Sequence, residues 1–423
     1  MRRRRRNTNP TSPPRKGMLR LLHVIETMAP HEGGPPRVVA GLAVAQGSVG
    51  IDAHILCGDG AELPDHLRYW QAHAPGFPID SVHTIVPSSN NLAARAAALR
   101  GWLRANLPNF DVVHIHQLWR LVPTLAATAC RRMCVPYLIA PHTSLSPWAL
   151  AQKRPKKLLA RWLVWNRNFM GAAGFHALND LEAAEIRECI GRGGPPVFIV
   201  PNGVSLAEFP ETTTPAASPT IARLLSPSDG IRPFILFFAR LHTMKGPDLL
   251  LDAFASVAPA HPALQLVFAG PDFGMLDALQ RRTAQLRLTD RVHFLGLISG
   301  SDRLWLLRNA LCLSQPSRDE GFSLSILEAM ASRCPVVISE RCKFPEVALY
   351  RAGIIVSMSI PDLAAALCAY AGDSARRTSD GLSARRLVET RYTWDMVANQ
   401  ADQMYARIMD QGPGLIAPAG EPR

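Results

Sequence analysis

Two glutamates, Glu320 and Glu328, stand eight positions apart where the sequence pattern changes. The stretch 311–339 reads as a buried strand, a turn, a helix over 322–331 and a second buried strand at 336–338. In such a unit ligands bind at the carboxyl ends of the strands, and the first N–H groups of the helix favour an anion. The two carboxylates and the helix start would suit a sugar ring, a phosphate and a ribose bound in series. The backbone groups concerned belong to Gly321, Phe322, Ser323 and Leu324.

Two cations stand five positions apart in a second connection between strand and helix. The apolar run 234–238 predicts a buried strand, and Arg240 and Lys245 follow it, ahead of a helix that begins near residue 247. Two cations that converge on one site can hold a diphosphate and stabilise the charge it gains on leaving. The alternative is a pair of solvated surface cations.

A glycine pair marks the first loop of the chain. Gly33 and Gly34 lie between an expected strand at 18–27 and an expected helix at 38–47. Because glycine has no Cβ, the backbone here can approach a ligand closely. A tight turn between strand and helix would call for the same residues.

Three histidines fall at or near the ends of expected strands in the first half. His142 follows the strand 136–140 and opens a polar loop, as expected of a residue at a ligand-binding edge. His114 and His116 would point to the same face of the strand 111–116. That arrangement could ligate a metal, but we interpret both as satisfied histidines of the core or the rim.

Composition places the chain among globular proteins of two or three domains. It has 423 residues, of which 48% are hydrophobic and 19% charged. Seven positive charges behind the net +12 lie in the first sixteen residues, where there is no acid. Such an arm can meet anionic lipid or nucleic acid, or can be a solvated tail. The polar, Pro-rich residues 7–14 do not resemble a signal peptide. The eight dispersed cysteines predict buried thiols in a reducing compartment.

The alternation of expected strands and helices predicts an α/β protein with two doubly wound domains. A Pro-, Ser- and Thr-rich stretch separates the halves and reads as a linker. We predict a disordered basic arm over residues 1–17 and a first domain over 18–205. The linker is expected over 206–232 and the second domain over 233–391. A final helix, over 392–410, is expected to return to the first domain.

These motifs together resemble family 4 of the retaining nucleotide-sugar glycosyltransferases, whose fold is GT-B, two Rossmann-like domains facing a central cleft. The likeness covers roughly residues 21–408. It rests on the two glutamates with seven residues between them, on Arg240 and Lys245, and on Pro316-Ser317, Glu320-Gly321-Phe322, Leu327-Glu328-Ala329-Met330 and Pro335-Val336-Val337. Ser323 and Arg333 depart from the family, which more often has glycine at both positions.

The resemblance implies roles for individual residues. Arg240 and Lys245 would stabilise the departing diphosphate, and Glu328 would bind ribose hydroxyls. Glu320 would hold the transferred sugar from its far side, and His142 would contact a sugar hydroxyl or stabilise charge at the reacting carbon. The glycine pair would approach phosphate and acceptor, and the loop at Gly270 and Asp272 would lie near the nucleotide. No Asp-x-Asp occurs in the chain, which fits the metal-independent members, so we expect no metal and no cofactor.

The expected partners are a nucleotide-sugar donor and a saccharide or lipid-linked acceptor, with no nucleic acid. Residues 153–169 combine early basic residues with an apolar and aromatic stripe, which can lie on an anionic membrane. The alternative is a domain helix with its tryptophans in the core. We expect a cytoplasmic protein that can lie at the inner face of the plasma membrane and that serves cell-surface, exopolysaccharide or lipopolysaccharide assembly. Alternative functions are a nucleotide-sugar epimerase and a non-catalytic protein that binds membrane or nucleic acid through its arm.

Overall fold

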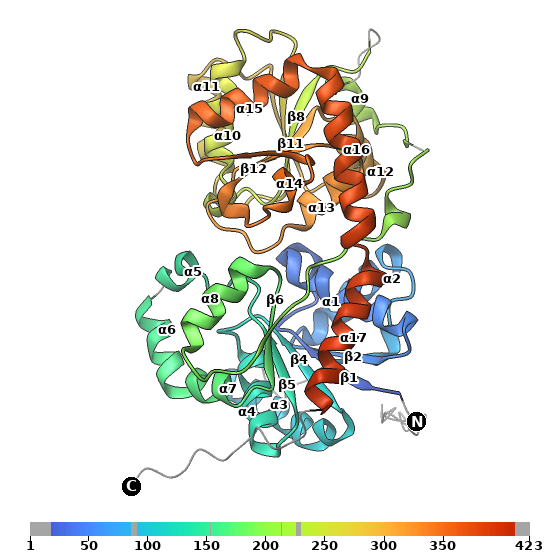
Figure 1. The fold of residues 1–423 in the computed structure, drawn as a ribbon, viewed down its shortest axis with the longest axis vertical. Helices are drawn as coiled ribbons and strands as arrows, with labels where there is room; N and C mark the ends of the chain where they lie inside the picture. The colour runs from blue at the N-terminus through green and yellow to red at the C-terminus, as the bar shows by residue number, and fades with distance from the viewer. Residues whose placement is uncertain (1–17, 86–90, 153, 213, 226–229, 411–423) are drawn as a thin grey trace, which may run out of the picture.

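Two domains lie end to end in the computed structural model, and the chain returns from the second domain so that its last helix lies on the first (Figure 1). The structure describes residues 18–85, 91–152, 154–212, 214–225 and 230–410. The predicted basic arm and the tail from residue 411 lie outside these ranges. The GT-B fold expected from the sequence is confirmed by the two parallel sheets and their covering helices.

The first domain is built on a parallel sheet of seven strands in the order β3-β2-β1-β4-β5-β6-β7. Its central strands are buried on both faces, as the helical layers on each side require, whereas the edge strands β3 and β7 are partly exposed. The strands are β1 (Arg20–Val24), β2 (Asp52–Cys57), β3 (Val82–Thr84), β4 (Val112–His116), β5 (Tyr137–Ala140), β6 (Gly174–Ala177) and β7 (Val197–Ile199). The helices are α1 (Gly34–Ser48), α2 (Leu63–His73), α3 (Leu92–Asn106), α4 (Leu121–Met133), α5 (Pro147–Ala151), α6 (Arg154–Ala160), the π-helix η5 (Arg161–Trp165), α7 (Asn166–Met170) and α8 (Asp180–Ile190).

The second domain has a six-stranded parallel sheet in the order β10-β9-β8-β11-β12-β13. Its strands are β8 (Phe234–Phe238), β9 (Gln265–Ala269), β10 (Val292–Gly296), β11 (Cys312–Gln315), β12 (Val336–Ser339) and β13 (Gly353–Val356). The helices are α9 (Pro219–Leu225), α10 (Pro247–Val257), α11 (Leu276–Gln285), α12 (Gly300–Asn309), α13 (Leu324–Ala331), α14 (Glu346–Leu349), α15 (Ile360–Gly372) and α16 (Ser374–Arg391).

In each sheet the strand order reverses between two neighbours, β1 and β4 in the first and β8 and β11 in the second. Open α/β sheets bind ligands outside the carboxyl ends of the strands at such a reversal. The loop of Gly33 follows β1, while Arg240 follows β8 and Glu320 follows β11. The fold therefore brings the predicted residues to the edges where ligands bind.

Helix α17 (Trp394–Asp410) packs on the first domain. Its side chains Met404, Tyr405 and Ile408 belong to that domain's core. The Trp394 ring lies so close to Gly41 and Gly203 that a Cβ on either would stand 2.3 and 2.6 Å from ring atoms. Glycine at these two positions lets the tryptophan at the start of α17 pack between helix α1 and the segment that follows β7.

Two expectations need correction. The helix expected over 322–331 begins at Leu324, with Ser323 as its N-terminal cap residue. Not all cysteines are buried thiols, since Cys134 is exposed and has a left-handed φ of 56° at the end of α4. No helix within the described ranges is long and apolar enough to cross a membrane.

Candidate active site between the domains

Two loops of the second domain are locked together at the carboxyl end of its sheet. The Lys245 loop (239–246) follows β8, and the Glu320 loop (316–323) follows β11. The N–H of Arg318 donates to the carbonyl of Met244 at 2.7 Å. Gly246 has a φ of 69°, and a Cβ there would lie 2.1 Å from the carbonyl oxygen of Pro316. This close approach fixes the position of Lys245 relative to Glu320.

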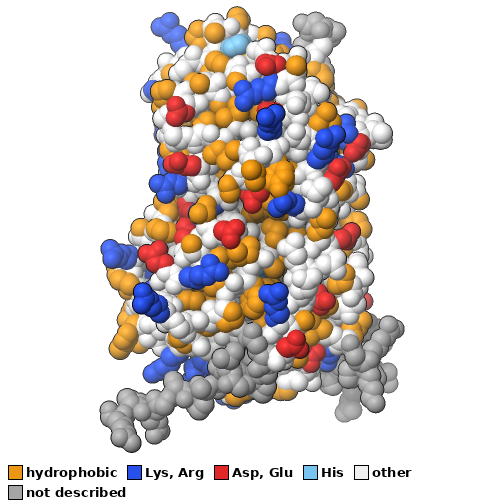
Figure 2. All heavy atoms as spheres, viewed as in Figure 1, with side chains coloured by type: hydrophobic (Ala, Val, Ile, Leu, Met, Phe, Trp, Pro, Cys, Tyr) orange, Lys and Arg blue, Asp and Glu red, His pale blue; other side chains and the backbone are white. Residues whose placement is uncertain are grey.

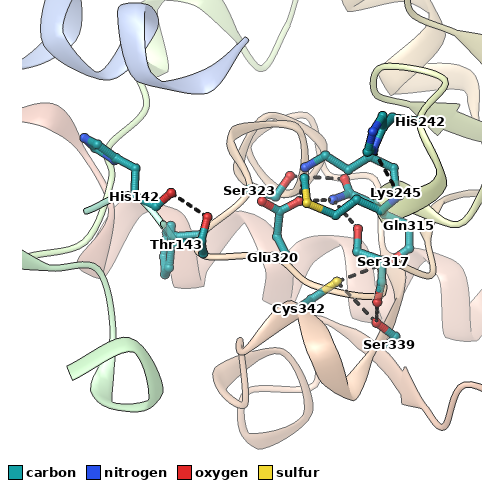
Figure 3. Close-up of polar contacts among 12 residues, drawn as sticks. His142, Thr143, His242, Lys245, Gln315, Ser317, Glu320, Ser323, Ser339 and Cys342 are labelled. Atoms are coloured by element: carbon teal, nitrogen blue, oxygen red, sulfur yellow. Dashed lines mark hydrogen bonds and ion pairs between the residues drawn. The ribbon is translucent and has the colours of Figure 1, made fainter. Parts of the chain in front are cut away.

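Lys245 and Glu320 form an ion pair in which both side chains are almost enclosed, 12% and 11% exposed (Figure 3). The same Oε2 of Glu320 accepts a hydrogen bond from Nε2 of Gln315 at 2.7 Å, and Ser323 Oγ donates to Gln315 Oε1 at 3.1 Å. Sequence reasoning missed Gln315 as a site residue. A polar residue at the end of a buried strand was the available signal.

Arg240 lies across from the first domain. Its guanidinium stacks on the Phe273 ring, 4.8 Å from the ring centroid. Gly33, with a φ of 97°, approaches so closely that a Cβ would stand 3.3 Å from Cζ of Arg240. The structure thus brings the predicted glycine loop and the predicted cation together.

The contact with Arg240 distinguishes the two glycines of the loop, because Gly33 makes it and Gly34 does not. A Cβ at Gly34 would meet nothing within 4 Å. We expect Gly33→Ala to lower stability by about 1–3 kcal/mol, because its backbone conformation strains any L side chain, and to displace Arg240 with a loss of turnover. Gly34→Ala is the matched control and should be neutral or slightly stabilising. Chemical denaturation and donor turnover of both variants would check this, and equal behaviour of the two would contradict it.

Glu328 is buried in α13 and is held by two arginines. Arg303 of α12 contacts its Oε1 at 3.2 Å, and Arg37 of α1 reaches the same oxygen from the first domain. The other carboxylate oxygen, Oε2, is buried and has no hydrogen-bond partner. A buried acceptor without a donor is costly unless a ligand supplies one. Neither arginine was predicted as a site residue.

Two asparagine side chains of the first domain hold the backbone at the start of α13. Asn179 Nδ2 donates to the carbonyl of Gly321 at 2.7 Å, and Asn202 Nδ2 donates to that of Phe322 at 2.9 Å. The N–H groups that follow, at Ser323 and Leu324, belong to the first turn, where a helix offers no internal acceptors. An anion beside Lys245 could accept from them.

Gly270 and Asp272 shape a neighbouring turn. A Cβ at Gly270 would lie 1.9 Å from the carbonyl oxygen of Ala239. Asp272 Oδ1 accepts from the N–H groups of Gly274, Met275 and Leu276 at 2.8–3.0 Å. The hydrogen bonds from Leu276 and Met275 hold the pKa of the Asp272 carboxyl below its usual value. Both residues therefore support the strand exit next to Arg240.

His142 is half-buried and stands apart from the ion pair. It has a left-handed φ of 49°, and its ring is turned away from Glu320 and Lys245 (Figure 3). Its Nε2 lies 2.9 Å from Nδ1 of His116. The next residue, Thr143, packs against Gly321, where a Cβ would come within 2.6 Å of its methyl group. His142 thus lies at the domain interface, one residue from the Glu320 loop.

Both halves of the chain match known glycosyltransferase sequences. Residues 33–203 match the family described as glycosyl transferase 4-like domain, and residues 225–371 match glycosyl transferases group 1. The chain is 30% identical over 325 residues to a D-inositol 3-phosphate glycosyltransferase of Streptomyces avermitilis, covering 74% of this chain and 68% of that protein. The chain belongs to the group 1 glycosyltransferases.

A second relative and two solved structures extend the comparison. This glycosyltransferase is 27% identical over 370 residues to the lipopolysaccharide core biosynthesis mannosyltransferase LpcC of Rhizobium leguminosarum, covering 82% of this chain and 99% of that protein. Its fold matches Anabaena HepE in complex with UDP and glucose, with a TM-score of 0.72, 18% identity and coverage of 92% and 100%. It also matches sucrose-phosphate synthase of Thermosynechococcus elongatus, with a TM-score of 0.72, 21% identity and coverage of 93% and 100%.

The two departures from the family pattern have local explanations in this glycosyltransferase. Ser323 uses its hydroxyl to orient Gln315, the residue that donates to Glu320. Arg333 keeps the left-handed turn that a glycine would make after α13, with a φ of 61°. Its guanidinium pairs with Glu211, so it links the end of the helix to the segment that precedes α9.

Proposed function

We propose that this glycosyltransferase moves a sugar from a nucleoside diphosphate sugar to an acceptor hydroxyl, with retention of configuration at the anomeric carbon and without a metal. The acceptor oxygen would bond to C1, the bond from C1 to the diphosphate oxygen would break, and the acceptor proton would pass to that phosphate. Lys245 and Arg240 would stabilise the charge that the diphosphate gains.

The observation that carries the proposal is the buried, unpartnered oxygen of Glu328 on α13, close to the ion pair that joins the two loops. Glu328 presents a buried oxygen without a donor, which suits a ribose hydroxyl. Lys245 lies beside the start of α13, where it pairs with Glu320. A diphosphate bound there would compete with Glu320 for this cation. Release of Glu320 would leave its carboxylate to accept from hydroxyls of the sugar. Ribose, diphosphate and sugar would then lie in series, as the spacing of the two glutamates predicts.

The relatives indicate where to look for donor and acceptor. One is named as a lipopolysaccharide core mannosyltransferase, and a protein of similar fold is described with UDP and glucose. We therefore propose UDP- or GDP-hexoses as donors and a glycan of the cell surface as the product. The named relatives are transferases, so the epimerase alternative is not favoured.

A donor screen tests this function. Purified protein would be incubated with UDP-, GDP- and ADP-sugars, with and without chelator, and release of the nucleoside diphosphate measured. Turnover of one donor class that is insensitive to chelator, with an α-linked product from an α-linked donor, supports the proposal. An inverted product, or activity that depends on an added divalent ion, would contradict it.

The segment 154–170 supports a second part of the proposal, contact with an anionic membrane. The predicted single apolar stripe is wrong, because the structure splits it between two faces. Trp165 and Phe169 are buried in the core, whereas Leu158, Leu159, Trp162 and Leu163 are all more than half exposed, Trp162 by 74%. The π-helix η5 explains the split, since its wider turn rotates the residues after it relative to α-helical spacing.

The exposed side chains lie beside basic residues. Arg154, Lys156 and Arg167 are exposed on the same segment, and Figure 2 shows hydrophobic and basic side chains together at the edge where Figure 1 places α5 and α6. An apolar group that enters the headgroup region, flanked by cations, binds anionic lipid surfaces. This face would hold the enzyme at a membrane that carries its acceptor.

Replacing Leu159 and Trp162 by serine is expected to weaken binding to phosphatidylglycerol-containing vesicles by about tenfold or more, because two apolar side chains no longer leave water. Vesicle co-sedimentation at low and high salt would measure it. Leu349→Ser is the matched control, since Leu349 is 75% exposed on the second domain. Equal binding of the wild type and the double variant would contradict the membrane contact.

A further inference from the structure

A continuous chain of hydrogen bonds runs through the interior of the first domain and ends at His142. His142 bonds to His116 at 2.9 Å, and His116 bonds to Nδ1 of His23 at 2.9 Å. Nε2 of His23 lies 2.7 Å from Gln46 Oε1, and Gln46 Nε2 lies 3.1 Å from the hydroxyl of Tyr405.

The chain continues beyond Tyr405 to a backbone carbonyl. The Tyr405 hydroxyl lies 2.9 Å from Nδ1 of His114, and Nε2 of His114 lies 3.1 Å from Nδ1 of His176. His176 closes the chain with Nε2 at 2.7 Å from the carbonyl oxygen of Val200. Apart from half-buried His142, every side chain in it is buried.

The carbonyl of Val200 sets the direction of every bond, because a carbonyl can only accept. Nε2 of His176 must donate to it, so its Nδ1 accepts from Nε2 of His114. Nδ1 of His114 then accepts from the Tyr405 hydroxyl, which in turn accepts from the amide of Gln46. The same logic continues through His23 and His116, and with neutral rings the proton of His142 lies on Nε2.

A reversed amide of Gln46 would break this order. Gln46 Oε1 would then accept from Tyr405, Tyr405 would accept from His114, and His176 would have to place its proton on Nδ1. Two acceptors, Nε2 of His176 and the carbonyl of Val200, would face each other at 2.7 Å. Only one direction satisfies all eight groups.

We propose that Tyr405, on the returning helix α17, is a positioning residue that holds His142 with its proton on Nε2 and so presents Nδ1 as a hydrogen-bond acceptor. Among the described residues, none hydrogen-bonds to Nδ1 of His142. A ring fixed in this way accepts from a hydroxyl and cannot donate to one at that atom. On the function proposed above, the matching group is a hydroxyl of sugar or acceptor.

A metal ion would compete with this chain. Ring nitrogens of His23, His114 and His116 lie within 4.8 Å of one another, close enough to share one ion. Each of their ring nitrogens, however, already has a hydrogen-bond partner. The chain accounts for all six nitrogens with neutral rings, so the hydrogen-bonded arrangement is the one we infer.

Nitrogen NMR of protein labelled with ¹⁵N-histidine tests the proposal, because long-range proton–nitrogen correlations distinguish the two tautomers of each ring. In the wild type, His142 should carry its proton on Nε2. In Tyr405→Phe the amide of Gln46 loses its partner, so His23, His116 and His142 should become tautomeric mixtures. His176 should keep its proton on Nε2, since its link to Val200 remains.

Tyr137→Phe is the matched control, because Tyr137 is equally buried and donates to the carbonyl of Asn168 at 2.6 Å, outside the chain. It should leave all five histidines unchanged. A wild-type His142 protonated on Nδ1, a joint shift of His23, His114 and His116 on addition of Zn²⁺, or an unchanged His142 in a folded Tyr405→Phe would overturn the proposal. The wild-type spectrum decides even if the variant does not fold.

Donor turnover separates this proposal from the proposed function. Tyr405→Phe should lower kcat/KM by about three- to tenfold, the effect of one neutral hydrogen bond, and Tyr137→Phe should not. An unchanged kcat/KM in a variant whose His142 tautomer is released would overturn the positioning role. If the wild type turns over no donor while His142 shows the predicted tautomer, the proposed function fails and the chain of hydrogen bonds stands.

Discussion

Replacing Lys245 by alanine is expected to lower kcat by about 10²–10³-fold, the range found when one preorganised group that stabilises transition-state charge is removed. Lys245 lies beside the start of α13 and is almost enclosed, so little water can replace it at the leaving phosphate. The KM for the acceptor should change far less, because the ammonium lies at the Glu320 loop, on the donor side. Steady-state kinetics with the donor found by screening would measure both.

A control must show that the loss of kcat comes from removing the Lys245 cation and not from breaking an ion pair as such. Glu320 keeps the hydrogen bond from Gln315 in Lys245→Ala, so the fold should survive. Arg282→Ala is a suitable control, because it removes a cation from an ion pair with Asp252, at 2.9 Å on the outer helices. It should leave kcat unchanged. Full activity of Lys245→Ala would rule out its role at the diphosphate.

The sequence was sufficient to place Glu320 and Lys245 at strand ends, because apolar runs and glycine breaks are local signals. Parallel strands bring their carboxyl ends to one edge, so the two loops had to be neighbours once both strands were recognised. Gln315 was missed because its function depends on a side-chain contact with Glu320 that local pattern does not encode. Arg37 was missed for a stronger reason, since its contact with Glu328 depends on how two separate domains face each other.

His142 shows the limit of reasoning from strand ends. Its place at the end of β5 was predicted, yet the direction of its ring depends on the left-handed backbone at residues 142 and 143. The neighbours of His114 and His116 depend on the lateral order of strands and on a helix about 290 residues further along. Pattern alone places these two histidines on one face, and their ring centroids are indeed 4.3 Å apart. It does not supply Tyr405.

Acidification is expected to destabilise the fold steeply below pH 6.5, because the first domain buries neutral histidines. Burial lowers the pKa of His23 and of His176 from 6.5 to about 4, and lowers the pKa of His114 and His116 well below 6.5. Between these values and 6.5 the unfolded chain binds protons that the folded chain does not. Stability is therefore fully present above pH 6.5 and is lost as the pH falls toward 4.

The size of the stability loss depends on how many more protons the unfolded chain binds than the folded chain does. Each buried histidine contributes up to about 1.4 kcal/mol per pH unit, so four of them can remove on the order of 5 kcal/mol between pH 6 and 5. Urea denaturation at intervals from pH 7.5 to 5 would give the slope, in a range where ordinary carboxylates stay ionised. His23→Gln should flatten it by about one proton, whereas His73→Gln, at an exposed position of α2, should not. A stability that stays level to pH 5 would mean that the interior accepts protons, and the neutral hydrogen-bond chain from Val200 to His142 would then be wrong.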